Sequence, residues 1–272
     1  MDNLGLRYEE RAQHAKNPAA KQLFELMSYK KTNLTFSDDE TDPDRFLELA
    51  DLMGPEIAVL KTHIDILESF VPDITKRLSE LANEHNFMIF EDRKLADIGN
   101  TSVLQYTKGI YRIADWANFV NVHVVSGPGI IDGIGKANEE MRDSISRGII
   151  ILSQMSTEGN LASGNYTLKA TEFAKKYEGS VAGHIGNGGN ASELAKLSKL
   201  CVPGHILFTP GVNIEKGGDG KGQIYSSPDM AIAAGSDTII VGRGIYGTRN
   251  PVNTAKTYRD AGWTAYTKRI KK

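Results

Sequence analysis

The residue types best suited to chemistry lie in the segment Asp92-Arg93-Lys94-Leu95-Ala96-Asp97, which closely follows a short apolar run at residues 86–90. Side chains alternate along a strand, so Asp92 and Lys94 are expected to point the same way where this strand ends. Asp97 follows after a short spacer and can curl back toward them. Burying charge costs free energy unless each charge has a partner. The segment therefore indicates a reactive cluster, with a solvated turn rich in salt bridges as the alternative.

Length and composition narrow the class of protein. The chain has 272 residues, a length typical of one α/β barrel. A formal net charge of -2 gives no electrostatic footprint for nucleic acid or an anionic membrane. The one cysteine, Cys201, allows no disulfide within the chain, which fits a reducing compartment. Residues 1–31 lack the apolar stretch of a signal peptide, and no apolar run approaches the roughly 20 residues of a membrane span. We therefore expect a cytoplasmic protein that binds neither nucleic acid nor membranes.

Short apolar runs alternate with segments of helical periodicity along the whole chain. Strands that are apolar on both faces and alternate with helices imply a parallel sheet. Eight such repeats favour a closed (β/α)8 TIM barrel over an open doubly wound sheet. We expect one domain over residues 1–272, with residues 1–31 as an N-terminal helical cover. The predicted strands are residues 34–36, 57–60, 87–90, 119–122, 149–152, 181–185, 206–208 and 238–241.

Polar groups follow most of these strands. The C-terminal ends of the strands carry the functional groups in a barrel of this kind. Lys61 and His63 are two apart and share a face, so His63 is expected to orient a substrate or a neighbour, with a purely structural hydrogen bond as the alternative. The strand ends read Ser37-Asp38-Asp39, Lys61-Thr62-His63, Asp92-Arg93-Lys94, Gln154-Met155-Ser156, Thr209-Pro210-Gly211 and Gly242-Arg243-Gly244.

The last of these strand ends indicates a phosphate site. Gly242-Arg243-Gly244 follows the eighth predicted strand, where TIM barrels usually bind phosphate. Glycines let backbone N–H groups approach an anion, and an arginine side chain offers a bidentate fork. The glycine-rich loop at residues 211–224 is expected to be a lid over a bound phosphate and ribose, with a disordered surface loop as the alternative.

Taken together, these motifs resemble orotidine 5′-phosphate decarboxylase of the eukaryotic, single-function type. The resemblance runs from about residue 31 to the C-terminus and follows the family order. It implies a homodimeric α/β barrel that converts orotidine 5′-monophosphate to UMP and CO2, the last step of de novo pyrimidine synthesis, without a metal or organic cofactor. The motifs that carry it are Lys61-Thr62-His63, Asp92-x-Lys94-x-x-Asp97-x-Gly99-Asn100-Thr101, Ser126-Gly127-Pro128-Gly129, Thr209-Pro210-Gly211-Val212, Gly222-Gln223-x-Tyr225 and Val241-Gly242-Arg243-Gly244.

The resemblance also implies roles for the catalytic residues. Lys94 would donate the proton to C6, and Asp92 would lie against the departing carboxylate. Lys61 would pair with Asp92 and meet the ribose. Asp97, together with Thr101, would reach into the site of the neighbouring subunit.

The implied substrate contacts come from several strand ends. Asp39 would hold a ribose hydroxyl and Ser156 the pyrimidine, while Gln223, Tyr225 and Arg243 would hold the phosphate. The implied substrate-binding set also includes Ser37, Thr62, His63, Ile98, Thr101, Pro210 and Gly242.

Three alternatives stay open at this point. The family usually has an apolar residue before its strand-one aspartate, whereas this chain has Asp38-Asp39; counting back from Lys61 selects Asp39, with Asp38 as the alternative. A phosphosugar enzyme of the same barrel superfamily would share the D-x-K-x-x-D pattern but use Mg²⁺ for an enediolate. A non-catalytic barrel that binds nucleotides or regulates a partner is the alternative from another class, and an intact Asp92 and Lys94 argue against it.

Overall fold

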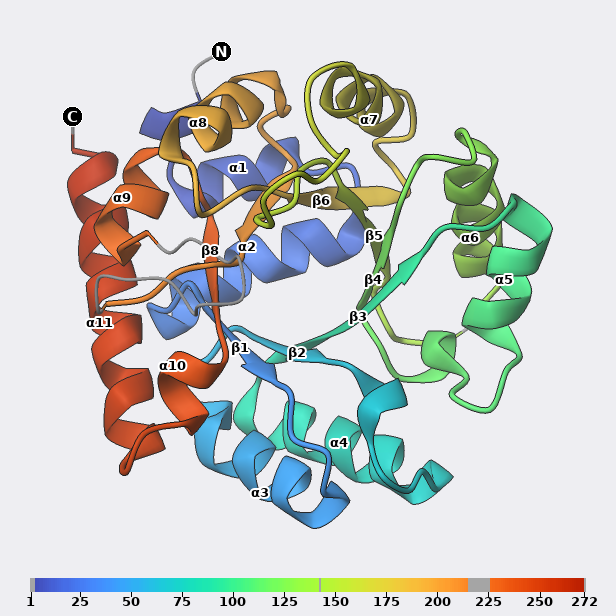
Figure 1. Cartoon of the computed structure of the whole chain (residues 1–272), viewed down its shortest axis with the longest axis horizontal. Helices are drawn as coiled ribbons and strands as arrows, with labels where there is room; N and C mark the ends of the chain where they lie inside the picture. The colour runs from blue at the N-terminus through green and yellow to red at the C-terminus, as the bar shows by residue number, and fades with distance from the viewer. Residues whose placement is uncertain (1–2, 142, 215–225, 272) are drawn as a thin grey trace.

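The computed structural model describes residues 3–141, 143–214 and 226–271, and at its centre is a closed barrel of parallel strands (Figure 1). Each strand pairs with the next along the chain, and β8 closes the barrel on β1 through the pair Leu34 and Ile239. The TIM barrel predicted from the sequence is confirmed. The strands are β1 (Leu34–Asp38), β2 (Val59–Thr62), β3 (Met88–Leu95), β4 (Phe119–Val122), β5 (Gly148–Leu152), β6 (Val181–Ile185), β7 (Ile206–Thr209) and β8 (Thr238–Val241).

Helices surround the barrel (Figure 1), and several of them begin after a residue whose side chain caps the first turn. Ser227 accepts a hydrogen bond from the Met230 N–H at 3.3 Å ahead of the first residue of α9, Pro228, and a serine cap followed by proline is a favoured helix start. Asp42 caps α3 in the same way. The helices are α1 (Tyr8–His14), α2 (Pro18–Lys30), α3 (Pro43–Met53), α4 (Pro72–His85), α5 (Gly99–Thr107), α6 (Gly129–Glu140), α7 (Asn165–Lys176), α8 (Ala191–Leu200), α9 (Pro228–Ala233), α10 (Arg243–Tyr246) and α11 (Pro251–Arg269), with the 3₁₀ turns η1 (Asn3–Gly5), η2 (Gly54–Glu56), η3 (Ile64–Ile66) and η4 (Ile113–Asp115).

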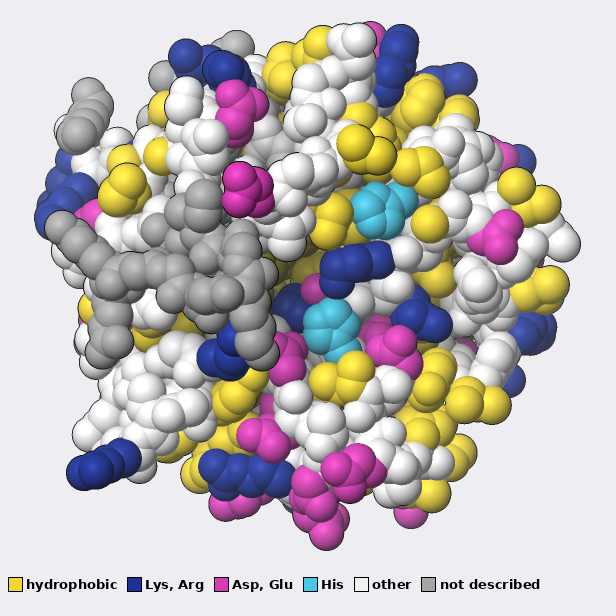
Figure 2. Space-filling view, in the orientation of Figure 1, with side chains coloured by type: hydrophobic (Ala, Val, Ile, Leu, Met, Phe, Trp, Pro, Cys, Tyr) yellow, Lys and Arg dark blue, Asp and Glu magenta, His cyan; other side chains and the backbone are white. Residues whose placement is uncertain are grey.

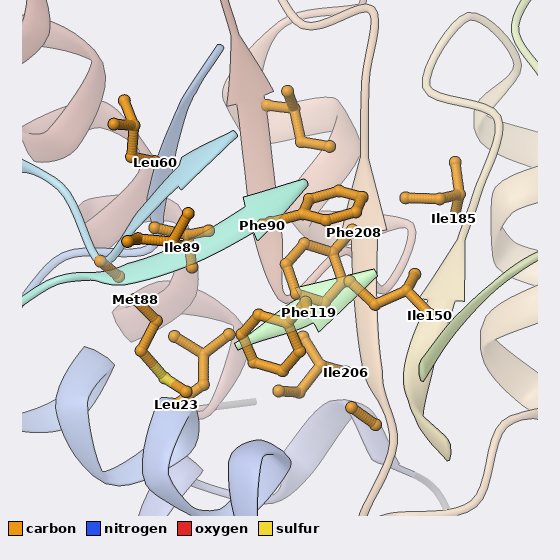
Figure 3. Close-up of a cluster of buried hydrophobic side chains, with 14 of the residues drawn as sticks. Leu23, Leu60, Met88, Ile89, Phe90, Phe119, Ile150, Ile185, Ile206 and Phe208 are labelled. Carbon is orange, nitrogen blue, oxygen red and sulfur yellow. The ribbon is translucent and has the colours of Figure 1, made fainter. Parts of the chain in front are cut away.

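The end of the barrel where the strands begin is filled with apolar side chains. Leu23 of α2 is fully buried and lies beside Phe119 and Ile206, each the first residue of its strand (Figure 3). Phe208 packs above them, with its ring centroid 5.8 Å from that of Phe119 and 5.7 Å from that of Phe90. This packed floor leaves the opposite end of the barrel to the functional groups.

Strand β3 departs from the expected pattern in a way that shapes the site. It continues to Leu95, beyond the predicted end at residue 90. Glu91 pairs with Val120 and Leu95 with Val122, so residues 92–94 of β3 lie opposite the single residue Asn121 of β4. Extra residues of this kind form a bulge, which turns side chains in new directions. The directions of Asp92 and Lys94 therefore come from a bulge and not from the alternation of a regular strand.

Within the residues that the structure describes, no helix combines the length and apolar character needed to cross a membrane.

Candidate active site

A cavity of about 920 Å³ opens at the C-terminal ends of the strands. Figure 2 shows basic, acidic and histidine side chains gathered around a hollow near the centre of this face. Most of the strand ends named from the sequence contribute to its lining. The predicted site residues that line it are Ser37, Asp39, Lys61, Asp92, Lys94, Ser156, Pro210, Gly242 and Arg243.

A row of alternating charges crosses this cavity. The Asp92 carboxylate lies between two ammonium groups, with Oδ2 at 2.9 Å from Lys61 Nζ and Oδ1 at 2.6 Å from Lys94 Nζ. Asp39 extends the row, because its Oδ1 lies 3.8 Å from Lys61 Nζ. Acidic and basic groups from β3, β2 and the end of β1 thus alternate across the barrel mouth.

The two lysines decide the charge of Asp92. Burial alone would raise the pKa of this carboxyl, but the nearby Lys61 and Lys94 ammonium groups lower it well below its usual range. Asp92 is therefore ionised at neutral pH, and it holds both ammonium groups at the cavity wall. A buried charge of this kind is tolerated only because it is paired on both sides.

His63 completes the contacts of Lys61. Its Nε2 lies 2.8 Å from Lys61 Nζ and 3.4 Å from Asp92 Oδ2. Burial and the Lys61 cation lower the pKa of His63, so the ring is neutral at neutral pH. An ammonium group only donates, so Nε2 accepts and the ring proton lies on Nδ1. His63 therefore fixes the direction of the Lys61 ammonium.

The next side chains of the same strands face away from the cavity. Thr62 is fully buried and donates its hydroxyl to Glu91 Oε2 at 2.6 Å, while the Ile64 N–H reaches the same carboxyl at 3.2 Å. Burial raises the pKa of Glu91 to about 8, so this acid is largely neutral at pH 7. The Thr62 side chain thus supports the strand end from behind and does not line the cavity.

The structure separates the two adjacent aspartates of β1. Asp39 lines the cavity and accepts a hydrogen bond from the Ser37 hydroxyl at 2.9 Å. Asp38 is buried behind the strand end, where its Oδ1 accepts the Glu40 N–H at 3.2 Å, and burial raises its pKa to about 8. The geometry favours Asp39, which the count back from Lys61 also selected.

Gly242 and Arg243 line the cavity next to β1. A Cβ added at Gly242 would lie 3.1 Å from the carbonyl oxygen of Ser37 and 3.4 Å from Asp39 Oδ2. Any larger residue would therefore push against the end of β1. The absent side chain lets the start of α10 approach the charged row closely.

The loop between β3 and α5 stands apart from the row. Asp97 is exposed, and its Oδ1 accepts the N–H of Ile98 at 2.7 Å. Among the ion pairs of the described residues, none joins Asp97 to Lys94. Ile98 is 63% exposed and Thr101 is half-buried. Asp97 and Ile98 therefore lie at the surface of the molecule.

Sequence reasoning missed some of the lining residues. Asn121 on β4 lines the cavity and is 1% exposed; the signal was an amide within an otherwise apolar strand. Thr254, Thr257 and Tyr258 of α11 also line it. The Tyr258 hydroxyl donates to Asn213 Oδ1 at 2.8 Å. No local motif marked this helix, because it reaches the site only through the closure of the barrel.

Part of the predicted phosphate site and most of the predicted lid are not described by the structure. Gln223, Tyr225 and most of the predicted lid at residues 211–224 lie outside the described residues. Across residues 3–141, 143–214 and 226–271, no three His, Cys, Asp or Glu side chains are grouped so that they could hold a metal ion.

A closed (β/α)8 barrel with charged groups at the C-terminal ends of its strands has the organisation of a TIM-barrel enzyme. Residues 32–258 match the model of the orotidine 5′-phosphate decarboxylase / HUMPS family. The chain is 43% identical over 267 residues to orotidine 5′-phosphate decarboxylase of Emericella nidulans, covering 97% of each chain. It is 45% identical over 265 residues to that of Schizosaccharomyces pombe, covering 97% of this chain and 96% of the relative. The chain belongs to the orotidine 5′-phosphate decarboxylase / HUMPS family.

Solved structures agree with this fold. The chain superimposes on orotidine 5′-phosphate decarboxylase from Pyrococcus horikoshii with a TM-score of 0.66 and 26% identity, covering 84% of this chain and 99% of that one. The enzyme from Methanocaldococcus jannaschii complexed with inhibitor BMP gives a TM-score of 0.67 at 21% identity, covering 85% of this chain and 98% of that one.

The buried Glu91 predicts a pH-dependent stability. The pKa of Glu91 is raised on folding from its ordinary value of 4.5 to about 8, so its contribution to stability is complete below about pH 4.5 and is lost as the pH rises toward 8. In Glu91→Gln this titration is removed. The unfolding free energy of the wild type should therefore fall relative to that of the variant by more than about 1 kcal/mol between pH 5 and pH 8, since one pKa unit corresponds to about 1.4 kcal/mol.

Denaturant titrations at both pH values measure this difference. Glu84→Gln, at an exposed position of α4, is the matched control and should follow the wild type. A constant offset between wild type and Glu91→Gln at both pH values would contradict the prediction.

Proposed function

We propose that this protein catalyses the decarboxylation of orotidine 5′-monophosphate to UMP and CO2. Family membership and the names of the relatives that match nearly the whole chain support this reaction. The observation that carries it is the Asp92 carboxylate held between the Lys61 and Lys94 ammonium groups at the barrel mouth. The cavity volume of about 920 Å³ is within the range of small-molecule sites.

The reaction needs a cation beside one carbon atom. Loss of CO2 from C6 of the pyrimidine leaves an electron pair in an in-plane orbital, which the ring cannot delocalise. In our proposal the Lys94 ammonium stabilises this charge as it develops and then transfers a proton to C6. The bond between C6 and the carboxyl carbon breaks, and the bond between C6 and hydrogen forms in its place.

Asp92 has two parts in this scheme. Its ionised carboxylate accepts a hydrogen bond from the Lys94 ammonium at 2.6 Å and so holds this group at the cavity wall. It would also lie against the substrate carboxylate, where repulsion between like charges is relieved when neutral CO2 departs. Binding energy from distant parts of the substrate offsets that repulsion.

The rest of the nucleotide would follow the cavity lining. We assign the ribose hydroxyls to Asp39 and Lys61, the pyrimidine to Ser156, and the phosphate to Arg243 beside Gly242. All of these residues line the same cavity, which supports the assignment. We also assign substrate contacts to Ser37, His63 and Pro210, and phosphate contacts to Gln223 and Tyr225.

We further propose that the enzyme is a cytoplasmic homodimer with shared sites and that it needs no metal or organic cofactor. Large apolar side chains are exposed around the cavity loops, with Ile98 at 63%, Val125 at 68% and Leu161 at 91% exposed. An isologous contact over this surface would cover these side chains. It would also bring Asp97, Ile98 and Thr101 of one subunit toward the site of the other. Activity that persists in EDTA would support the metal-free reaction and argue against a Mg²⁺-dependent phosphosugar enzyme.

The first test removes the proposed proton donor. In Lys94→Ala, kcat for orotidine 5′-monophosphate should fall by several powers of ten, since a lost acid or electrostatic group costs roughly 10²–10⁴-fold each. Affinity for UMP should change much less, because Lys94 acts on charge that appears only in the transition state. The ultraviolet absorbance change during turnover measures kcat. Lys21→Ala, on an exposed part of α2, should behave as wild type; a folded Lys94→Ala with more than about a tenth of wild-type kcat would remove Lys94 from this role.

The second test concerns the phosphate. Arg243→Ala should lower kcat/KM for orotidine 5′-monophosphate and hardly change kcat/KM for unphosphorylated orotidine. The reason is that the proposed contact between the guanidinium group and the substrate is made to the phosphate. Steady-state assays with both substrates give the two ratios. Arg77→Ala, at an exposed ion pair of α4, is the control. Equal relative losses for both substrates would show that Arg243 supports the fold instead.

The third test addresses the shared site. Lys94→Ala and Asp97→Ala homodimers should both be nearly inactive, since each of their sites lacks one member. After subunit exchange, a hybrid dimer has one site that lacks both residues and one that lacks neither. Random equimolar mixing should restore about a quarter of wild-type activity per subunit, because about half of the dimers are hybrids with one intact site. No recovery despite demonstrated exchange would mean that Asp97 acts within its own chain.

A further inference from the structure

Asn121 occupies the gap that the bulge of β3 creates. Residues 92–94 lie opposite this single residue of β4, and its side chain is 1% exposed. A buried amide costs free energy unless its donors and acceptor are bonded. Its partners therefore show what the amide is for.

Both ends of the Asn121 amide bond to the charged row. Oδ1 accepts the backbone N–H of Lys94 at 2.6 Å, and Nδ2 donates to Asp92 Oδ1 at 2.6 Å. A backbone N–H can only donate, so the oxygen of the amide must face Lys94 and the nitrogen must face Asp92. The orientation of the side chain is thus fixed by its partners.

The Lys94 backbone needs such support. Its φ of 53° lies in the left-handed region, which costs about 1 kcal/mol or more for a residue with a side chain. The hydrogen bond to Asn121 Oδ1 stabilises this conformation. It thereby fixes the backbone position from which the Lys94 side chain extends. The same Asp92 oxygen that Asn121 contacts also accepts the Lys94 ammonium at 2.6 Å. One amide therefore fixes Lys94 at its backbone and, through Asp92, at its charged end.

We propose that Asn121 is a positioning residue for decarboxylation: it sets the place of the Lys94 ammonium by holding the Lys94 backbone and the Asp92 carboxylate together. This inference rests on the proposed function for its catalytic meaning, whereas the hydrogen bonds exist independently of it. Asn121 acts through Lys94 and Asp92, and no chemical step is assigned to it.

Replacing the amide by a carboxyl group gives a diagnostic change. In Asn121→Asp, one oxygen can still accept the Lys94 N–H, but the other faces Asp92 Oδ1 at hydrogen-bond distance. Two carboxyl groups this close share one proton, as in a carboxylate dyad. With Lys61 and Lys94 holding Asp92 ionised, the proton stays on residue 121 and reproduces the lost donor. When the proton leaves at higher pH, the two anions repel and the positions of Asp92 and Lys94 are disturbed.

Other titratable groups face the same place. They are Asp39 after β1, Lys61 and His63 from β2, Asp92 and Lys94 from β3, and His123 after β4, whose pKa is lowered by burial and by Lys94. All of them remain in wild type and variant, so the ratio of the two pH profiles isolates position 121.

The experiment compares pH profiles of kcat and KM for orotidine 5′-monophosphate in wild type, Asn121→Asp and Asn121→Ala. In Asn121→Asp, kcat should approach the wild-type value at low pH and fall by up to about 100-fold as the pH rises, since a misplacement of about 1 Å can cost that much. In Asn121→Ala the loss should be the same at every pH. KM should change much less than kcat in both variants.

Asn118 offers a matched control. It also joins β3 to its neighbours, with Oδ1 accepting the Ile89 N–H at 2.9 Å and Nδ2 donating to the Ser146 carbonyl at 3.1 Å, but it lies at the other end of the strands. Asn118→Asp should keep the wild-type pH profile of kcat. The inference is overturned if Asn121→Asp keeps that profile too, or if Asn118→Asp shows the same pH-dependent loss. Should Asn121→Asp fail to fold, an Asn121→Ala variant that retains more than about a third of wild-type kcat overturns it as well.

A second readout does not depend on activity. Exchange of the Lys94 amide hydrogen, followed by NMR, should be slow in the wild type and markedly faster in Asn121→Ala, while Asn118→Ala should leave it slow. A wild-type protein that does not consume orotidine 5′-monophosphate would contradict the proposed function, and amide exchange would still decide whether Asn121 holds Lys94. Unchanged exchange in Asn121→Ala overturns the positioning itself.

Discussion

The structure of the site depends on one ionised carboxylate held between two ammonium groups. Asp92 would be unstable in this place alone, because burial opposes its charge. Lys61 and Lys94 offset that cost only if both remain within hydrogen-bond distance. The geometry around the carboxylate is therefore constrained from several sides: His63 directs Lys61, and Asn121 holds the Lys94 backbone. Moving either ammonium group would leave the buried Asp92 charge paired on one side only.

A second layer lies behind this row, and its electrostatic character is the opposite. Side chains that face the cavity are charged, whereas the acids on the outer side of the same strands, Asp38 and Glu91, have pKa values raised to about 8 by burial. A neutral acid behind an ionised one adds hydrogen bonds without adding negative charge. Thr62 links the two layers: its sequence neighbours Lys61 and His63 lie at the charged row, whereas its own hydroxyl bonds to Glu91 behind the row. The barrel wall thus keeps the charge on one side of the sheet.

The sequence predicted the barrel well because each strand and helix is encoded locally. Apolar runs, proline starts and the Ser227 cap depend on neighbours in the chain, and the bounds of most strands followed from them. What failed depends on contacts between distant segments. The bulge at residues 92–94 arises from pairing with Asn121, so no pattern within β3 alone predicts it. The sequence allowed Asp97 to turn back toward Lys94 without requiring it; in the structure its side chain is exposed. Tyr258 reaches the cavity because α11 packs against β1, α9 and α10.

The apolar floor beneath the site has a consequence for molecular traffic. Leu23 and the phenylalanine rings fill the barrel where its strands begin, so within the described part of the chain the cavity is a blind chamber that opens at the strand ends. For the reaction proposed here, substrate, water and both products would enter and leave through this one opening. A nucleotide bound through its phosphate would block this opening. CO2 would then have to leave past the bound UMP or after it. The order of product release would therefore depend on the shape of the barrel as well as on the affinity of each product.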